Sequence, residues 1–223
     1  MKNLFCILLF MGLYSCSTLD AQDWPNLAKY QEANSKIDVN SMETRIVFMG
    51  NSITEGWGER VFFKNPKYIN RGISGQTTPQ MLIRFRPDVV DLKPKVVVIL
   101  AGINDIAGNT GPSTIKMIAN NIYSMAEIAI ANDIKVILCS TLPAYDFPWS
   151  PGKEPAPKVI ALNKMVKAYA EQNDIHYLDY FSAMVDDRNG MQKAYSYDEV
   201  HCTDAGYEVM EGLFEKAISE VIN

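Results

Sequence analysis

The segment KVVVILA at residues 95–101 restricts the fold of this chain more than any other stretch of its sequence. After Lys95 every side chain is apolar, so an extended chain here presents apolar residues on both of its faces. This pattern is typical of a central strand in a parallel sheet that helices cover on both sides. We therefore expect the segment to be the middle strand of such a sheet.

Other segments of strand composition alternate with segments of helical composition along the chain. The further predicted strands cover residues 45–50, 68–71, 135–141 and 175–180, and the predicted helices cover residues 23–43, 55–64, 77–87, 114–132, 158–172 and the stretch from residue 203 onward. This alternation predicts an α/β protein with three α/β/α layers around a mainly parallel sheet of about five strands. The loops that follow parallel strands lie at one edge of the sheet, where open α/β sheets bind their ligands.

Length and charge limit the number of domains and the class of partner. The chain has 223 residues, of which 48% are apolar, so we expect one domain over residues 22–223. The formal net charge is -5. Because a nucleic-acid-binding surface needs an excess of basic residues, this balance argues against nucleic acid as a partner.

The first 21 residues have the pattern of an export signal. Lys2 is the only charged residue before position 20, and an apolar core follows at residues 4–11. That core is shorter than the roughly 20 residues that a membrane-spanning helix needs. The pattern predicts export from a bacterial cytoplasm to the periplasm, the cell envelope or the outside of the cell.

Two sites for removal of this signal compete. Residues 13–16, LYSC, resemble a bacterial lipobox, whose cleavage would leave Cys16 as a lipidated N-terminus. Cleavage after Ala21 is the alternative, and it would release the protein without a lipid. Contact with a membrane is expected only through a lipid anchor at Cys16.

The cysteine pattern predicts no metal site. Only Cys139 and Cys202 lie beyond the signal, and the chain has no CxxC pair or Cys/His cluster at the spacing of metal ligands. A Cys139–Cys202 bridge is compatible with an oxidising compartment, and the sequence leaves its formation open.

Ser52 follows the apolar run of residues 46–49 and precedes a segment of helical composition. A serine on such a strand-to-helix turn lies at the ligand-binding edge of the sheet, next to the free N–H groups of a helix N-terminus. Most serines at these positions only cap the helix. The same position also suits a nucleophile, because the free N–H groups can stabilise a developing oxyanion.

The two histidines differ in their surroundings. His176 lies in the apolar segment of residues 175–178, where packing is the expected role. His201 lies in a polar loop, three residues after Asp198. That spacing allows the carboxylate to accept the Nδ1 proton and leaves Nε2 free to accept a proton from a serine. His201 is therefore the candidate base and Asp198 the acid that orients it.

Asn104 and Gly75 also follow predicted strands. Each residue type has an ordinary role in turns. An asparagine amide is also a good oxyanion donor, and a glycine can present its backbone N–H at close approach. Together with Ser52, Asp198 and His201, they make up the set of groups that acyl transfer requires.

Four short blocks resemble those of a known family. They are GNSI at residues 50–53, GISG at 72–75, GIND at 102–105 and DEVH at 198–201. In this order they are similar to the blocks of the SGNH hydrolases, also called GDSL esterases, and they cover most of the chain from residue 45 onward. TDAGY at residues 203–207 also resembles the start of that family's last helix.

The resemblance implies a role for each candidate. Ser52 would be the nucleophile, His201 the general base and Asp198 its orienting acid. The backbone N–H groups of Ser52 and Gly75 would form the oxyanion hole with the side chain of Asn104. The resemblance also implies a flavodoxin-like sheet, no metal and no organic cofactor.

The expected reaction is hydrolysis of a small acyl ester, such as an acetyl ester, of a carbohydrate or similar polar molecule. The candidate substrate contacts are Asn51, which stands where the family name has Asp, and the aromatic residues Trp57, Tyr145 and Trp149. Fold does not select among the family's substrates, so a lysophospholipase or thioesterase is the alternative. A non-catalytic binding module is less well supported, because it has no need for a complete set of acyl-transfer groups.

Overall fold

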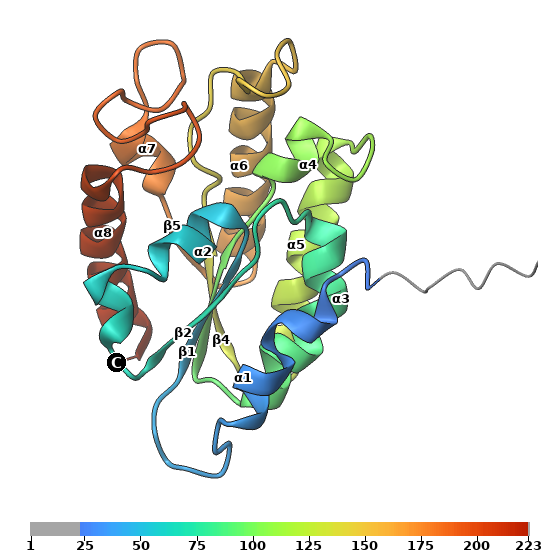
Figure 1. The fold of residues 1–223 in the computed structure, drawn as a ribbon, viewed down its shortest axis with the longest axis vertical. Helices are drawn as coiled ribbons and strands as arrows, with labels where there is room; N and C mark the ends of the chain where they lie inside the picture. The colour runs from blue at the N-terminus through green and yellow to red at the C-terminus, as the bar shows by residue number, and fades with distance from the viewer. Residues whose placement is uncertain (1–22, 223) are drawn as a thin grey trace, which may run out of the picture.

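A computed structural model describes residues 23–222 and contains a five-stranded parallel sheet (Figure 1). The strands are β1 (Ile46–Gly50), β2 (Tyr68–Gly72), β3 (Val96–Leu100), β4 (Lys135–Cys139) and β5 (His176–Leu178). Their order is β2-β1-β3-β4-β5, and all neighbours are parallel. This is the flavodoxin-like order, so the predicted fold class is confirmed. The predicted export signal and Cys16 lie outside the described residues.

The strand predicted to be central is central. All five residues of β3 are buried, and β3 lies between β1 and β4 in the sheet. Its side chains point alternately to the two faces, so both faces of the sheet must be covered by other elements.

Helices cover both faces of the sheet. The α-helices are α1 (Gln31–Ser35), α2 (Ser52–Trp57), α3 (Thr78–Asp88), α4 (Ile103–Ala107), α5 (Ile115–Ile130), α6 (Pro155–Gln172), α7 (Tyr180–Met184) and α8 (Asp204–Ile222), and the 3₁₀ helices are η1 (Leu27–Tyr30), η2 (Val61–Lys64) and η3 (Val90–Leu92). Helices α3, α5 and α6 pack side by side on one face. On the other face α8 packs against β1, where the rings of Phe48 and Phe214 lie 4.8 Å apart. Figure 1 shows these two helical layers on opposite sides of the strands.

Two helix predictions were wrong in extent. The helix predicted over residues 23–43 is limited to η1 and α1, because none of the residues in these two helices is buried and no apolar face supports a longer helix. The helix predicted over residues 55–64 begins earlier, at Ser52, and ends at Trp57 with Gly58 as its C-cap.

The register of the sheet brings three loops to one level. Gly50 at the end of β1 pairs with Gly72 at the end of β2 and with Leu100 at the end of β3. The loops that carry Ser52, Gly75 and Asn104 therefore begin side by side. They flank the point between β1 and β3 where the order of strands reverses, which is the usual ligand position in this fold.

The two cysteines beyond the predicted signal are buried free thiols. The Sγ of Cys202 lies 3.8 Å from the Sδ of Met210 on α8, and no bridge to Cys139 is formed. Between residues 23 and 222, no helix has both the length and the apolar character needed to cross a membrane.

Candidate active site

Ser52 is the first residue of α2 and follows β1 after a single intervening residue. That residue, Asn51, caps the helix, because its Oδ1 accepts a hydrogen bond from the N–H of Ile53 at 3.0 Å. Gly72 lets the end of β2 pack directly on this turn, since a Cβ at Gly72 would lie 2.2 Å from the backbone nitrogen of Glu55. These contacts fix Ser52 at the carboxyl edge of the sheet.

Ser52, His201 and Asp198 form a continuous chain of hydrogen bonds. The Oγ of Ser52 lies 2.9 Å from the Nε2 of His201. The Nδ1 of His201 lies 2.6 Å from the Oδ2 of Asp198. The structure therefore brings together the three residues that the sequence predicted as nucleophile, base and orienting acid, in the geometry that proton transfer from a serine requires.

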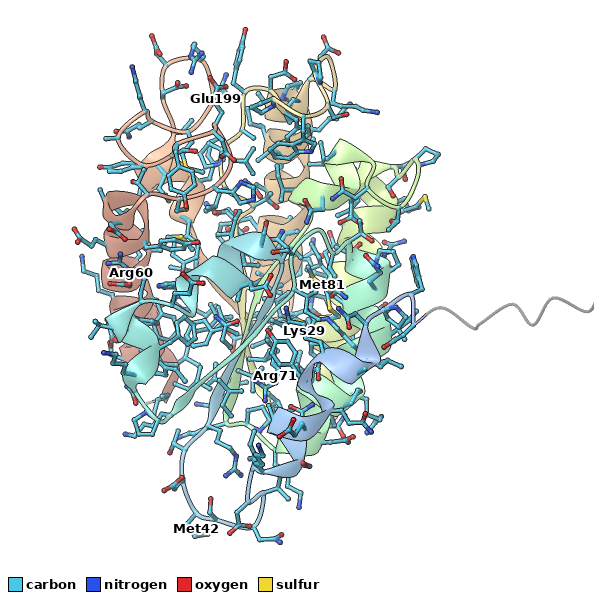
Figure 2. All side chains as sticks on the ribbon, viewed as in Figure 1. Lys29, Met42, Arg60, Arg71, Met81 and Glu199 are labelled. Carbon is cyan, nitrogen blue, oxygen red and sulfur yellow. The ribbon has the colours of Figure 1, made fainter. Side chains whose placement is uncertain are left out.

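The turn from Asp198 to His201 is built by the carboxylate of Asp198 itself. Its Oδ1 accepts the backbone N–H of Val200 at 3.0 Å and that of His201 at 2.7 Å. Glu199 adopts a left-handed conformation with φ of 70°, and Figure 2 shows it among the loops beyond the carboxyl ends of the strands. Burial opposes ionisation of Asp198, but the hydrogen bonds from His201 and Val200 outweigh it and hold its pKa below the ordinary value. An ionised Asp198 keeps the Nδ1 proton on His201.

Asn104 lies at the start of α4 and is buried. Its Nδ2 donates a hydrogen bond to the backbone carbonyl of Gln76 at 3.0 Å. An amide nitrogen carries two protons, so one N–H of Asn104 remains for a ligand. The same contact joins the loop after β3 to the loop that carries Gly75, where φ is +76°. A glycine is favoured at Gly75 because side chains rarely adopt this conformation.

Asp105, next to Asn104, has a supporting role that the sequence did not predict. Its carboxylate accepts the backbone N–H of Thr78 at 3.0 Å and the hydroxyl of Thr78 at 2.6 Å, which ties α4 to the start of α3. Burial raises the pKa of Asp105 to about 6, and the hydrogen bonds from Thr78 offset this only in part. The position of Asp105 in the GIND block could have identified it as a site residue. Its burial could not be predicted, because it depends on the packing of α3.

Arg84 also supports the site without having been predicted. It is fully buried and donates to the carbonyls of Gly50 at 3.0 Å and Arg71 at 2.8 Å, to Asp88 at 2.9 Å and to the side chain of Gln76. It therefore holds together the ends of β1 and β2 and the loop after β2. The sequence signal that could have identified Arg84 is its position as a charged residue on the apolar face of α3.

The burial of Trp57 and Asn51 contradicts the prediction that these two residues contact a substrate. Trp57 is only 1% exposed and stacks on Phe62 at 5.0 Å and on Tyr207 at 6.0 Å between ring centroids. It belongs to the aromatic packing between α2, η2 and α8. Asn51 is likewise buried, and its side chain is used by the helix cap. Both predictions were wrong, because both side chains are almost completely buried.

Trp149 and Tyr145 remain available to a ligand. They lie in the loop before α6 and are 49% and 48% exposed. The ring of Trp149 lies 5.9 Å from the ring of His201, and the guanidinium of Arg188 lies 4.8 Å from the centre of the Tyr145 ring. Phe147, between them in sequence, is fully buried and anchors the loop. Trp149 is thus placed beside the candidate base.

The described part of the chain offers no obvious ligand set for a metal. Within residues 23–222, no group of three or more histidine, cysteine, aspartate or glutamate side chains is arranged to hold an ion.

Comparison with known proteins identifies the family of this chain. The model of the GDSL-like lipase/acylhydrolase family matches residues 48–209. A crystal structure of a Bacteroides fragilis protein assigned as an acylhydrolase is 48% identical with a TM-score of 0.88, over 91% of this chain and 100% of that chain. The acetylxylan esterase Axe2 from Geobacillus stearothermophilus is 20% identical with a TM-score of 0.62, over 78% of this chain and 94% of that chain. The likeness to Axe2 shows the fold alone.

One curated relative adds a partial match. The uncharacterized lipoprotein YqeF of Bacillus subtilis (strain 168) is 37% identical over 83 residues, which are 35% of this chain. The match covers 34% of that protein, so the chain spans about a third of the length of the curated relative it matches.

The family match includes all four blocks that the sequence analysis singled out, and the loops that carry them meet at one edge of the sheet. The chain therefore belongs to the GDSL-like lipase/acylhydrolase family, the SGNH hydrolases, whose members hydrolyse ester bonds.

Proposed function

We propose that this protein is an exported serine esterase that removes a small acyl group, in the first place acetyl, from a carbohydrate or similar polar molecule. The observation that carries the proposal is the hydrogen-bonded chain from Asp198 through His201 to Ser52. Export with a lipid anchor at Cys16 is part of the proposal, and the partial match to a lipoprotein supports it.

In the first half of the reaction, the Oγ of Ser52 attacks the ester carbonyl carbon while its proton passes to the Nε2 of His201. The tetrahedral intermediate carries a negative oxygen. The backbone N–H groups of Ser52 and Gly75 and the free N–H of Asn104 donate to that oxygen. The bond to the alcohol then breaks, the alcohol oxygen takes the proton from His201, and the acyl group remains on Ser52.

In the second half, a water molecule attacks the acyl carbon and gives its proton to His201. The second tetrahedral intermediate collapses, the bond to the Oγ of Ser52 breaks, and the proton returns to that oxygen. The carboxylic acid leaves and the free enzyme is restored. Asp198 stays ionised throughout, since its pKa is held low, and it stabilises the imidazolium that forms on His201.

The surroundings of the triad favour a polar alcohol as leaving group. The oxygen of the alcohol must come within hydrogen-bond distance of the Nε2 of His201. The alcohol therefore lies next to Trp149, whose half-exposed ring is 5.9 Å from the ring of His201. A flat aromatic face with a solvated edge suits the C–H face of a sugar ring, while the hydroxyl groups stay in water. The acetylxylan esterase Axe2 shows that this fold can hold an esterase for an acetylated saccharide, while the choice of substrate depends on the site.

The cavity that borders Gly75 is polar and offers no groove for a long acyl chain, and neither Ser52 nor His201 lines it. It has a volume of about 450 Å³ and is lined mainly by polar residues, among them Ser74, Gln76, Asn109 and Thr110. A long acyl chain needs a contiguous apolar groove, because its binding depends on apolar area removed from water. This lining offers none.

The test is a series of p-nitrophenyl esters from acetyl to octanoyl, together with acetylated xylo-oligosaccharides. We expect kcat/KM to fall steeply with chain length and acetate to be released from the oligosaccharides. Ser52→Ala serves as the inactive control. A kcat/KM that rises with chain length would contradict the carbohydrate-esterase proposal and favour the lysophospholipase or thioesterase alternative.

A further inference from the structure

Ser74, the residue before Gly75, is held by a carboxylate that has no part in the proposed triad or oxyanion hole. The Oε2 of Glu55 accepts the backbone N–H of Ser74 at 2.7 Å and also the hydroxyl of Ser74. The Oε1 of Glu55 accepts a hydrogen bond from the ammonium group of Lys29. One carboxylate therefore links three segments that are far apart in the sequence.

The placement of Glu55 makes this link relevant to the site. Glu55 lies on α2, three residues after Ser52, and its backbone N–H donates to the carbonyl of Asn51 at 2.9 Å. Its side chain thus runs from the helix of the nucleophile to the residue before Gly75. The direction of the Gly75 N–H relative to Ser52 depends on the backbone conformation of Ser74, to which Glu55 is hydrogen-bonded.

Lys29 belongs to the lead-in segment, defined here as residues 23–36, which lies against the same loop. Gln76 donates its side-chain N–H to the carbonyl of Pro25 at 2.6 Å, and Gln80 donates to the carbonyl of Trp24 at 2.7 Å. Figure 2 shows Lys29 on this segment, close to α2. The lead-in segment is therefore packed onto the loop that carries Gly75, and Lys29 of this segment contacts Glu55.

The charge of Glu55 is compatible with this role. Burial opposes its ionisation, but the hydrogen bonds from Lys29 and Ser74 outweigh burial and lower the pKa of Glu55. At neutral pH the carboxylate therefore accepts from both groups of Ser74, and charge-assisted hydrogen bonds of this kind are about twice as strong as neutral ones.

We propose that Glu55 is a positioning residue for the oxyanion hole and that Lys29 of the lead-in segment holds it in place. Glu55 does not touch the substrate. It fixes Ser74 through its backbone N–H and hydroxyl, and so sets the direction of the Gly75 N–H toward the oxygen that becomes negative. The inference rests on the proposed function, because Gly75 acts as an oxyanion donor only in an acyl-transfer enzyme.

The kinetic test compares Glu55→Ala, Glu55→Gln and Lys29→Met on p-nitrophenyl acetate. We expect Glu55→Ala to lower kcat by about tenfold to hundredfold, as small misplacements of catalytic groups do. KM should change little, because the oxyanion forms only in the transition state. Glu55→Gln should recover part of the loss, since its amide oxygen still accepts from Ser74. Lys29→Met should add little to Glu55→Ala in the double variant, because the two residues act through one contact.

The chain offers a matched control in the same lead-in segment. Glu32 and Lys36 form an exposed ion pair, with the Nζ and Oε1 atoms 2.6 Å apart. This pair has the same charges but no contact with the loop that carries Gly75. Glu32→Ala and Lys36→Met should therefore keep wild-type kcat and KM.

A second measurement separates this inference from the proposed function. Amide hydrogen exchange at residues 73–76 should be faster in Glu55→Ala than in the wild type and unchanged in Glu32→Ala. Faster exchange in a protein without esterase activity would show that Glu55 holds the loop at Ser74 and would contradict the proposed function. An active wild type whose Glu55→Ala variant keeps its kcat would overturn the inference, as would unchanged exchange at residues 73–76.

Discussion

Asn104 divides its side-chain amide between two tasks. One N–H holds the carbonyl of Gln76 at 3.0 Å, and the other is available for the oxygen of the proposed substrate. The first contact keeps the amide in place before a substrate arrives. A donor held in this way needs no reorganisation when the negative charge develops, which is why such donors contribute strongly to catalysis.

Asn104→Ala should lower kcat by about a hundredfold to a thousandfold, the typical loss when one oxyanion donor is removed. KM should change little, because the donor acts mainly on the transition state. Steady-state kinetics on p-nitrophenyl acetate measures both constants. Asn173→Ala is the control, since its amide only caps a helix through the carbonyl of Tyr169. An unchanged kcat in Asn104→Ala would contradict the oxyanion role and leave Asn104 with a structural role in the turn.

At the residue scale, the sequence predicted the groups of the proposed triad and oxyanion hole but not the residues that hold them in place. Ser52, Asp198 and His201 stand in recognisable blocks, and the spacing of Asp198 and His201 is short enough to imply their contact. Glu55 and Arg84 gain their roles from partners in other segments. Their contacts with Lys29, Ser74 and the ends of β1 and β2 exist only after the sheet has formed.

Among the elements, α3 and α4 are joined by a buried charge. Asp105 on α4 accepts hydrogen bonds from Thr78 at the first turn of α3, a favourable position for a negative group. Burial nevertheless raises its pKa from 3.8 to about 6. A carboxyl group that binds its proton more tightly in the folded state stabilises the fold fully below pH 4, and this contribution is lost as the pH rises through about 6.

The free energy of unfolding of the wild type should therefore contain a term that declines between about pH 4 and 6. The rise in pKa corresponds to about 3 kcal/mol at most. Asp105→Asn removes the titrating group and keeps an oxygen acceptor for Thr78, so its stability should depend less on pH in this range. Urea unfolding at several pH values measures the difference. Parallel pH profiles for the two proteins would contradict the role of Asp105.

The elements that the sequence predicted well are those with a clear apolar period. All five strands and the helices α5, α6 and α8 occur close to where the apolar pattern placed them. The lead-in segment was predicted as part of a long helix because Trp24, Leu27 and Tyr30 recur at three-residue spacing. Trp24 and Leu27 are in fact exposed, and the segment meets the rest of the fold through polar side chains and backbone carbonyls. The packing role of Trp57 could not be predicted, because its stacking partner Tyr207 is distant in the sequence.

For the whole molecule, a lipid at Cys16 would determine where in the cell the protein is held. The lipobox-like residues 13–16 and the partial match to a lipoprotein both favour an anchor at the cell envelope. An anchor of this kind would hold an enzyme for polar esters near the cell surface and leave its cleft in water. Cleavage after Ala21 would instead release it.

We expect full-length protein made in a bacterial host to incorporate an alkyne-labelled fatty acid. Cys16→Ser should abolish the label, because the thiol that carries the lipid is lost. Cys6→Ser, inside the signal, is the matched control and should keep the label. A wild type that is exported without any label would contradict the anchor and support cleavage after Ala21.

The most direct test of the central claim is labelling of the wild-type protein by a fluorophosphonate probe, followed by peptide mapping. The probe reacts with a serine that an adjacent base has activated, and only Ser52 has its Oγ beside the Nε2 of His201 in the described part of the chain. We predict that Ser52 alone is labelled and that Ser52→Ala loses both the label and ester hydrolysis. Labelling of another serine, or wild-type turnover by Ser52→Ala, would contradict the account.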